Sequence, residues 1–349
     1  MIDYRALRSR YSLLQICREP ELAVAVTLQP VEAIDVDAAI LFSDLLLPFT
    51  PMGLDFDFLK GEGPAIDRPV RHAADVERVR TFEPREALAH VLTTIRLLRK
   101  ELDGRVPLIG FGGAPFTMAS YAIEGGPSTS YAKTKRFMYS QPVAWHALCD
   151  KFATVMADYL RAQIDAGVQA LQVFDSWAGQ LSRHDYCEFA QPHTKRIFDA
   201  LAGAGVPLLH FGVGTSAILA DMKAAGGDVI GVDWRLPIDE AWAVVGEDRA
   251  IQGNLDPATL LGPRERMIAA ADDVLRRAQG RPGHIFNLGH GVLPNTELET
   301  VQTLARHVHT FKIGYLKIHI VQSHHRRRRD HRSDCGIRTS QAWADSCRS

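Results

Sequence analysis

Short apolar runs alternate along the chain with longer amphipathic segments. Each run is continuously apolar over four or five residues, which is typical of strands buried on both faces of a parallel sheet. The segments between them place apolar residues three to four positions apart and predict helices, for example over 142–166, 185–202 and 263–279. This alternation indicates an α/β protein. Seven runs are predicted to be strands: 38–44, 107–113, 170–176, 207–213, 229–234, 250–256 and 284–290.

The spacing of these strands favours one barrel over two separate domains. All seven runs lie within 38–290 and no Gly/Ser-rich linker divides them, so we expect a (β/α)8 barrel instead of two doubly wound domains. The pattern does not locate an eighth strand. In a barrel the carboxyl ends of the strands surround one mouth, where the active site lies. A polar residue or glycine stands at or next to the end of each run: Asp44, Gly113, Ser176, Gly212, Asp233, Asp256 and His290.

The polar residues at these strand ends have two interpretations. A side chain at the mouth of a barrel can act on a bound ligand. An Asp or Ser that follows a strand more commonly caps the next helix. Taken one at a time, the pattern leaves both interpretations open.

Composition narrows the class of protein. With 46% hydrophobic and 23% charged residues, the chain has an ordinary globular composition. The richest apolar stretch, 38–49, contains Asp44 and Pro48 and is shorter than the roughly 20 residues that a membrane helix needs. The amino terminus lacks the apolar core of a secretory signal, and the five cysteines stand far apart without a C-x-x-C pair. We therefore expect a soluble, cytoplasmic protein with no disulfide framework and no membrane partner.

The net charge of -1 conceals a basic tail. Residues 312–349 hold nine Lys/Arg against three Asp/Glu, a charge of +6, which leaves -7 for residues 1–311. No helix or strand period runs through the tail, whose centre at 324–333 is rich in Arg and His. We predict a disordered, solvated tail with weak nonspecific affinity for phosphate, and no specific nucleic-acid partner.

Two motif types that would indicate a cofactor or metal are missing. The glycine-rich stretch 109–128 contains neither G-x-x-x-x-G-K-[ST] nor the third glycine of a dinucleotide fingerprint. We interpret its glycines as positions where the backbone approaches a bulky planar ligand. His210, His284 and His290 do not have the spacing of metal ligands, and each alone is expected to be a packed or capping side chain. We expect no cofactor and no metal.

Four long segments resemble the uroporphyrinogen decarboxylase family. They cover 21–58, 110–126, 171–182 and 287–301, in the order in which the family has them. The resemblance implies a distorted (β/α)8 TIM-type barrel that acts as a homodimer without cofactor or metal. It also implies a carboxy-lyase that converts the four acetate side chains of uroporphyrinogen to methyl groups, giving coproporphyrinogen in tetrapyrrole (haem) biosynthesis.

The resemblance also assigns site residues. The family's cleft aspartate falls on Asp44, its tyrosine on Tyr121, its serine on Ser176 and its histidine on His290. It implies that the Asp44 carboxylate accepts hydrogen bonds from pyrrole N–H groups and stabilises positive charge on the protonated ring. Tyr121, Ser176 and His290 are then expected to bind substrate carboxylates.

The chain departs from the family pattern at both ends. The family opens with a segment like R-Q-A-G-R-x-L-P-E-Y-R, of which Tyr4 and Arg5 match only the last two residues. We therefore expect a single barrel domain over 1–311 that is truncated at its amino terminus, with weaker substrate binding, followed by the atypical tail.

Two alternatives to the decarboxylase remain. One is a catalytically impaired barrel that binds a tetrapyrrole. The other is a zinc-dependent methyltransferase of the same superfamily, which would need His-x-Cys where this chain has His210-Phe211-Gly212.

Overall fold

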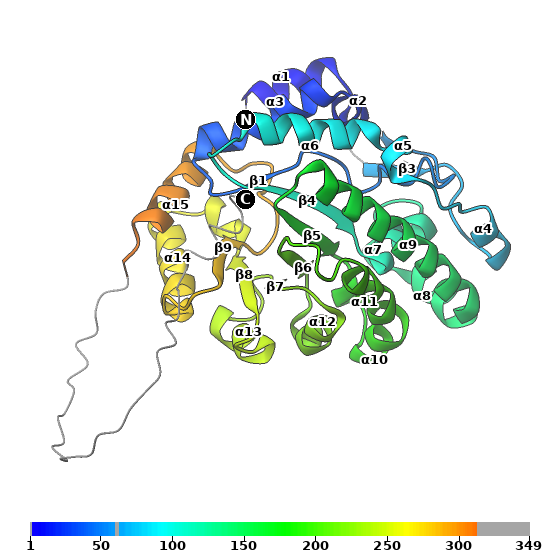
Figure 1. Ribbon diagram of the computed structural model, residues 1–349. Helices are drawn as coiled ribbons and strands as arrows, with labels where there is room; N and C mark the ends of the chain where they lie inside the picture. Colours follow the sequence, from blue (N-terminus) through cyan, green and yellow to red (C-terminus); the bar gives the residue numbers. More distant parts are fainter. Residues whose placement is uncertain (1, 60–62, 313–349) are drawn as a thin grey trace, which may run out of the picture.

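A curled parallel sheet surrounded by helices dominates the computed structural model, which describes residues 2–59 and 63–312 (Figure 1). Its seven strands are hydrogen-bonded in the order β1-β4-β5-β6-β7-β8-β9, and every neighbouring pair is parallel. A separate antiparallel hairpin joins β2 (Phe56–Leu59) to β3 (Gly63–Ile66). The sheet strands are β1 (Ala39–Ile40), β4 (Leu108–Gly113), β5 (Ala170–Asp175), β6 (Leu208–Gly212), β7 (Val229–Gly231), β8 (Ala250–Leu255) and β9 (His284–Leu288).

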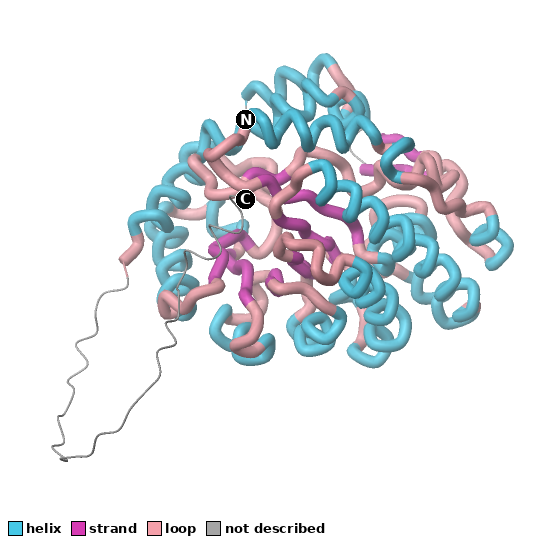
Figure 2. Tube along the Cα trace, viewed as in Figure 1, coloured by secondary structure: helices cyan, strands magenta, loops and turns pink. Residues whose placement is uncertain are grey.

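Helices cover the outer side of this sheet (Figure 2). Among them α3 packs on β1, α9 on β4 and β5, and α13 and α14 on β8. The helices are α1 (Ile2–Arg10), α2 (Leu13–Arg18), α3 (Pro20–Ile34), α4 (Ala73–Glu77), α5 (Pro84–Ala87), α6 (Ala89–Glu101), α7 (Pro115–Glu124), α8 (Ala132–Ser140), α9 (Pro142–Ala166), α10 (Arg183–Asp185), α11 (Gln191–Ala200), α12 (Leu219–Ala225), α13 (Ile238–Val245), α14 (Arg264–Ala278) and α15 (Leu298–Thr310). Short turns of other helix types are η1 (Ala178–Gln180), η2 (Tyr186–Ala190), η3 (Ser216–Ile218) and η4 (Pro257–Leu261).

The structure confirms the α/β barrel class and all seven predicted strands. The helix expected over 142–166 has those bounds as α9, and the helix expected over 263–279 is α14. The segment 185–202 is helical as well, but the wider turns of η2 interrupt it before α11 begins. In the described residues the main sheet has seven strands, not the eight of an ideal barrel.

Side chains fill both sides of the curled sheet. On the inner side Ala170, Leu209 and Val229 form one apolar cluster. Above it, the rings of Phe111 and Phe211 each meet Phe174 edge to face, at centroid distances of 5.6 and 5.9 Å. Alternate residues of the same strands join the outer core with the helices. Burial of the strands on both faces explains why their sequences are continuously apolar.

The glycines of β4 serve helix packing, which corrects our interpretation of them as ligand contacts. A Cβ atom at Gly112 would lie 3.2 Å from the Leu160 side chain of α9. A Cβ at Gly110 would collide with Gln163 of the same helix. The absence of side chains at these positions lets α9 approach the strand closely.

Helices connect the two edges of the sheet. The edge strands are β1 and β9, and α15, which follows β9, packs against α3, which precedes β1. The Gln302 side chain donates a 2.6 Å hydrogen bond to the Ala33 carbonyl across this contact. Because all seven strands are parallel, their carboxyl ends lie along one rim of the curled sheet.

Two further expectations concern membrane-spanning helices and the carboxyl-terminal tail. In the described part of the chain no helix is long and apolar enough to span a membrane. Apart from Lys312, the predicted tail over 312–349 lies outside the described residues.

Candidate active site

Asp44 lies just beyond β1, where the chain leaves the sheet and turns over residues 45–50. Its Oδ1 atom accepts a 2.8 Å hydrogen bond from the backbone N–H of Leu46. Burial raises the pKa of the Asp44 carboxyl above its ordinary value, and the hydrogen bond from Leu46 acts in the opposite direction. No described residue donates to Oδ2, so this oxygen is free for a ligand.

Tyr121 comes from α7, the helix that begins directly after β4. Burial, and after it the negative charge of Asp44, raise the pKa of the Tyr121 phenol to about 12. The hydroxyl is therefore protonated at neutral pH and can donate a hydrogen bond. The structure brings Tyr121 close enough to Asp44 for the carboxylate charge to raise the pKa of the phenol, although 77 positions separate the two residues in the sequence.

Ser176 follows β5 and is half-buried. The next residue, Trp177, stacks on Tyr121 with ring centroids 3.9 Å apart and a tilt of 36°. The Trp177 backbone N–H donates a 3.4 Å hydrogen bond to Thr117 Oγ1 on α7. These contacts join the ends of β4 and β5. Ser176 directly precedes Trp177, the residue that contacts Tyr121.

His290 follows β9, and its side chain is exposed. Its Nδ1 atom accepts a 2.6 Å hydrogen bond from the Gly291 backbone N–H, which places the proton of a neutral imidazole on Nε2. In the part of the chain that the structure describes, no hydrogen bond or ion pair joins His290 to Asp44, Tyr121 or Ser176. It lies at the same rim of the sheet, after the edge strand β9.

An arginine at this rim was missed from the sequence. Arg235 follows the predicted strand end Asp233 and forms an ion pair with its carboxylate. The signal was a basic residue two positions after a polar strand end. One such residue on a surface is too common to single out.

His210 does not face the inner side of the sheet. Its Nδ1 atom lies 3.2 Å from the Met222 carbonyl, and its Nε2 atom lies 3.6 Å from Asp175 Oδ2. Both side chains are fully buried, and the His210 ring packs against Phe198 of α11 at a centroid distance of 5.0 Å. His210 is thus a packed residue on the helix-covered side of β6. Within 2–59 and 63–312, no group of three or more His, Cys, Asp and Glu side chains is arranged to hold a metal ion.

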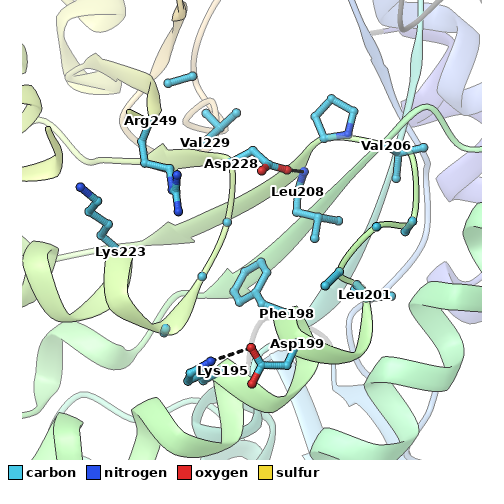
Figure 3. A pocket seen from close by; sticks show the side chains of 18 of the residues that line it. Lys195, Phe198, Asp199, Leu201, Val206, Leu208, Lys223, Asp228, Val229 and Arg249 are labelled. Carbon is cyan, nitrogen blue, oxygen red and sulfur yellow. Dashed lines mark hydrogen bonds and ion pairs between the residues drawn. The ribbon is translucent and has the colours of Figure 1, made fainter. Parts of the chain in front are cut away.

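A cavity of about 730 Å³ lies at the opposite end of the sheet, against the amino ends of β6, β7 and β8 (Figure 3). Its cations are already paired with acids. Lys195 contacts Asp199 at 2.6 Å, Lys223 contacts Asp248 at 2.6 Å, and Arg249 contacts Asp248 at 3.3 Å. The cavity therefore presents no cation without an acidic partner among its described lining residues, and its Asp228 carboxylate accepts a 2.9 Å hydrogen bond from the Leu208 N–H.

Comparison with known proteins identifies close relatives over most of the chain. The family model described as uroporphyrinogen decarboxylase (URO-D) matches residues 1–311. A uroporphyrinogen decarboxylase of Sorangium cellulosum is 56% identical over 310 residues, which cover 89% of this chain and 88% of the relative. One of Carboxydothermus hydrogenoformans is 52% identical over 309 residues, covering 88% of each chain.

Solved structures share the fold at low identity. A methyltransferase from Methanosarcina mazei matches with a TM-score of 0.67 at 20% identity, over 84% of this chain and 86% of that one. A B12-independent methionine synthase from Shewanella sp. W3-18-1 matches with a TM-score of 0.53 at 14% identity, over 83% and 87%. At these identities the likeness concerns the barrel architecture alone.

Proposed function

Because the chain belongs to the uroporphyrinogen decarboxylase family, we propose that it decarboxylates the four acetate side chains of uroporphyrinogen and gives coproporphyrinogen. The protein is an enzyme of the carboxy-lyase class. The observation that carries the site assignment is the half-buried Asp44 carboxyl beside Tyr121, at the carboxyl ends of adjacent strands. We take Asp44 as the catalytic residue, and Tyr121, Ser176 and His290 as substrate-binding residues.

The reaction develops positive charge on a pyrrole ring. Protonation of a pyrrole carbon makes the ring an iminium-like electron acceptor. The bond between the acetate methylene and its carboxylate then breaks, its electron pair moves into the ring, and carbon dioxide leaves. A proton added to the exocyclic methylene makes the methyl group, and the ring carbon releases the proton that it took up. A group that stabilises the cationic ring lowers the barrier most when it is fixed in place before the reaction.

Asp44 meets this requirement as a preorganised anion. The Leu46 N–H holds its Oδ1 atom, and the free Oδ2 atom can accept a hydrogen bond from the pyrrole N–H groups. Because burial excludes water, the attraction between the carboxylate and the cationic ring is stronger than it is in bulk solvent. The same burial disfavours the ionised carboxylate in the free enzyme, and a cationic ring reverses that effect.

The other three residues supply hydrogen-bond donors for the substrate's carboxylates. Tyr121 keeps its hydroxyl proton because its pKa is about 12. Ser176 presents a hydroxyl at the end of β5, and His290 presents Nε2 at the end of β9. Donors from α7 and from the ends of β5 and β9 allow one acetate to be oriented while the remaining carboxylates are held elsewhere.

The test of this function is the Asp44→Asn variant in a coproporphyrinogen-formation assay. The substitution keeps the size of the side chain and removes its charge, so we expect kcat to fall by about 100-fold or more. Asp37→Asn is the matched control, since Asp37 lies seven positions earlier with a side chain that is 89% exposed. Wild-type protein that forms no coproporphyrinogen would contradict the proposed function. An Asp44→Asn variant as active as the control would contradict only the role of Asp44.

We further propose that residues 1–311 form one barrel domain and that two chains associate as a homodimer in the cytoplasm. The domain is supported by a single sheet that takes strands from residue 39 to residue 288. The dimer is supported by the family resemblance. Sedimentation velocity should give a particle of twice the 38.6 kDa of one chain, and a particle of a single chain's mass would contradict the dimer.

A further inference from the structure

The loop after β7 holds an arginine against a buried carboxylate. The Asp233 side chain is 2% exposed and forms an ion pair with the guanidinium of Arg235. Asp233 Oδ2 also accepts a 2.6 Å hydrogen bond from the Gly214 N–H, in the loop after β6. Its Oδ1 accepts a 3.2 Å hydrogen bond from the Arg235 N–H. Several donors therefore share the charge of Asp233, and the Arg235 guanidinium is not its sole partner.

Two further contacts fix the direction of the Arg235 side chain. Its guanidinium carbon lies over the indole of Trp234, 4.4 Å from the ring centroid, as in a cation–π contact. From β8, the buried Asn254 side chain donates hydrogen bonds of 2.8 Å to the Asp233 carbonyl and 2.7 Å to the Leu236 carbonyl. The backbone on both sides of Arg235 is therefore clamped, and the guanidinium has little freedom to move.

The Arg235 side chain remains 49% exposed despite these contacts. A guanidinium has five N–H donors in a planar fork. Apart from Asp233, no described residue accepts a hydrogen bond from the guanidinium, so the fork retains donors for an anion.

Arg235 lies at the same rim of the sheet as the candidate active site, close to His290. A Cβ atom on Gly289 would lie 2.7 Å from the Trp234 backbone nitrogen and 3.0 Å from Trp234 Cε3, so the end of β9 is pressed against Trp234. His290 is the next residue. Trp234 thus separates two groups able to bind an anion, Arg235 after β7 and His290 after β9.

We propose that Arg235 binds a side-chain carboxylate of the substrate, an inference that rests on the proposed function because uroporphyrinogen carries eight such groups. The planar fork of arginine matches a carboxylate with two parallel hydrogen bonds. Asp233, Trp234 and Asn254 are positioning residues that hold the fork toward the rim before substrate arrives.

The test compares Arg235→Gln with Arg281→Gln in steady-state kinetics. Arg281 also stacks on a tryptophan, with its guanidinium carbon 4.0 Å from the Trp242 centroid, but it precedes β9 and so lies at the amino end of the sheet. We expect Arg235→Gln to raise KM by about 10- to 100-fold with a much smaller change in kcat. Arg281→Gln should leave both constants at the wild-type level. Arg235→Lys should recover part of the loss, because lysine restores the charge without the fork.

A binding measurement separates this inference from the proposed reaction. Uroporphyrin, the oxidised macrocycle with the same eight carboxylates, can be titrated by the quenching of its fluorescence. We expect Arg235→Gln to weaken its binding by the same factor as KM, and Arg281→Gln to leave it unchanged. Unaltered KM and uroporphyrin affinity in a folded Arg235→Gln variant would overturn the inference, as would a loss confined to kcat. A wild-type protein that binds uroporphyrin through Arg235 without decarboxylating uroporphyrinogen would overturn the proposed function alone.

Discussion

The Asp44 carboxyl group lies where burial disfavours its ionised form. Its folded-state pKa is raised above the ordinary value of 3.8 because burial disfavours the charged form. Between these two values the folded protein holds a proton that the unfolded chain has released. Stability therefore decreases as the pH rises through this window, and the cost is complete once the pH exceeds the folded-state pKa.

The ionised Asp44 carboxylate is needed for the reaction but costs stability. One substitution at this position is therefore predicted to have opposite effects on activity and stability. Asp44→Asn removes the buried charge and keeps an oxygen that can accept the Leu46 hydrogen bond. We therefore expect the variant to be more stable than the wild type at neutral pH, although it is less active. The gain should disappear as the pH falls toward 3.8, where the wild-type carboxyl is protonated as well.

Urea unfolding of both proteins at a series of pH values measures this difference. Asp103→Asn serves as the control, because the Asp103 side chain is exposed and no described residue forms an ion pair or hydrogen bond with it. A less stable Asp44→Asn variant at neutral pH would mean that hydrogen bonding to the ionised form outweighs burial.

At the scale of elements, the Gln163 side chain of α9 forms hydrogen bonds with the backbone of β4 where β1 no longer pairs with it. β1 pairs with β4 only as far as Ile109, because the chain then turns away toward Asp44. Beyond that point the fully buried side-chain amide of Gln163 forms hydrogen bonds with the backbone of β4. Its Oε1 accepts a 3.0 Å hydrogen bond from the Phe111 N–H, and its Nε2 donates a 2.8 Å bond to the Phe111 carbonyl. The absence of a side chain at Gly110 lets Gln163 reach across the strand.

Replacing this amide should destabilise the barrel without touching the substrate site. Gln163→Leu leaves the buried N–H and C=O of Phe111 without partners, so we expect the free energy of unfolding to fall by about 2–4 kcal/mol. Gln180→Leu, at an exposed position, should change it by less than about 0.5 kcal/mol. Equal midpoints of denaturant unfolding for the two variants would show that solvent or another group satisfies Phe111.

At the scale of the whole molecule, the ring of strands closes through helices. The contact of α15 with α3 takes the place of pairing between β1 and β9. β6 is buried along its whole length between two neighbours, whereas β9 is an edge strand without a fully buried residue. The molecule is therefore expected to open first at its β9 edge.

Hydrogen exchange of backbone amides tests this order of opening. We expect amides in β5 and β6 to exchange more slowly than those in β9, by roughly 100-fold under native conditions. The comparison is internal to one protein and needs no variant. Similar protection in all three strands would instead mean that the barrel opens as a single cooperative unit.

The sequence by itself determined the strands and their polar ends. A strand buried on both faces must be apolar throughout, so each of the seven runs is visible without its neighbours. Asp44, Ser176 and His290 follow such runs and were found by pattern as well as by resemblance, whereas Tyr121 came from the resemblance alone. These features are local, because they depend on a few consecutive residues.

Only the tertiary structure decided which distant groups meet. The clamp of Gln163 on Phe111, the stacking of Trp177 on Tyr121 and the packing of β4 glycines against α9 all join segments far apart in the chain. The glycines were misinterpreted from the sequence because a missing Cβ makes room equally well for a ligand or a helix. Arg235 was missed because its orientation depends on Asp233, Trp234 and Asn254, which lies on the neighbouring strand β8. The sequence pattern shows the chemical type of each residue and its local structure. The curling of the sheet determines which distant residues it contacts.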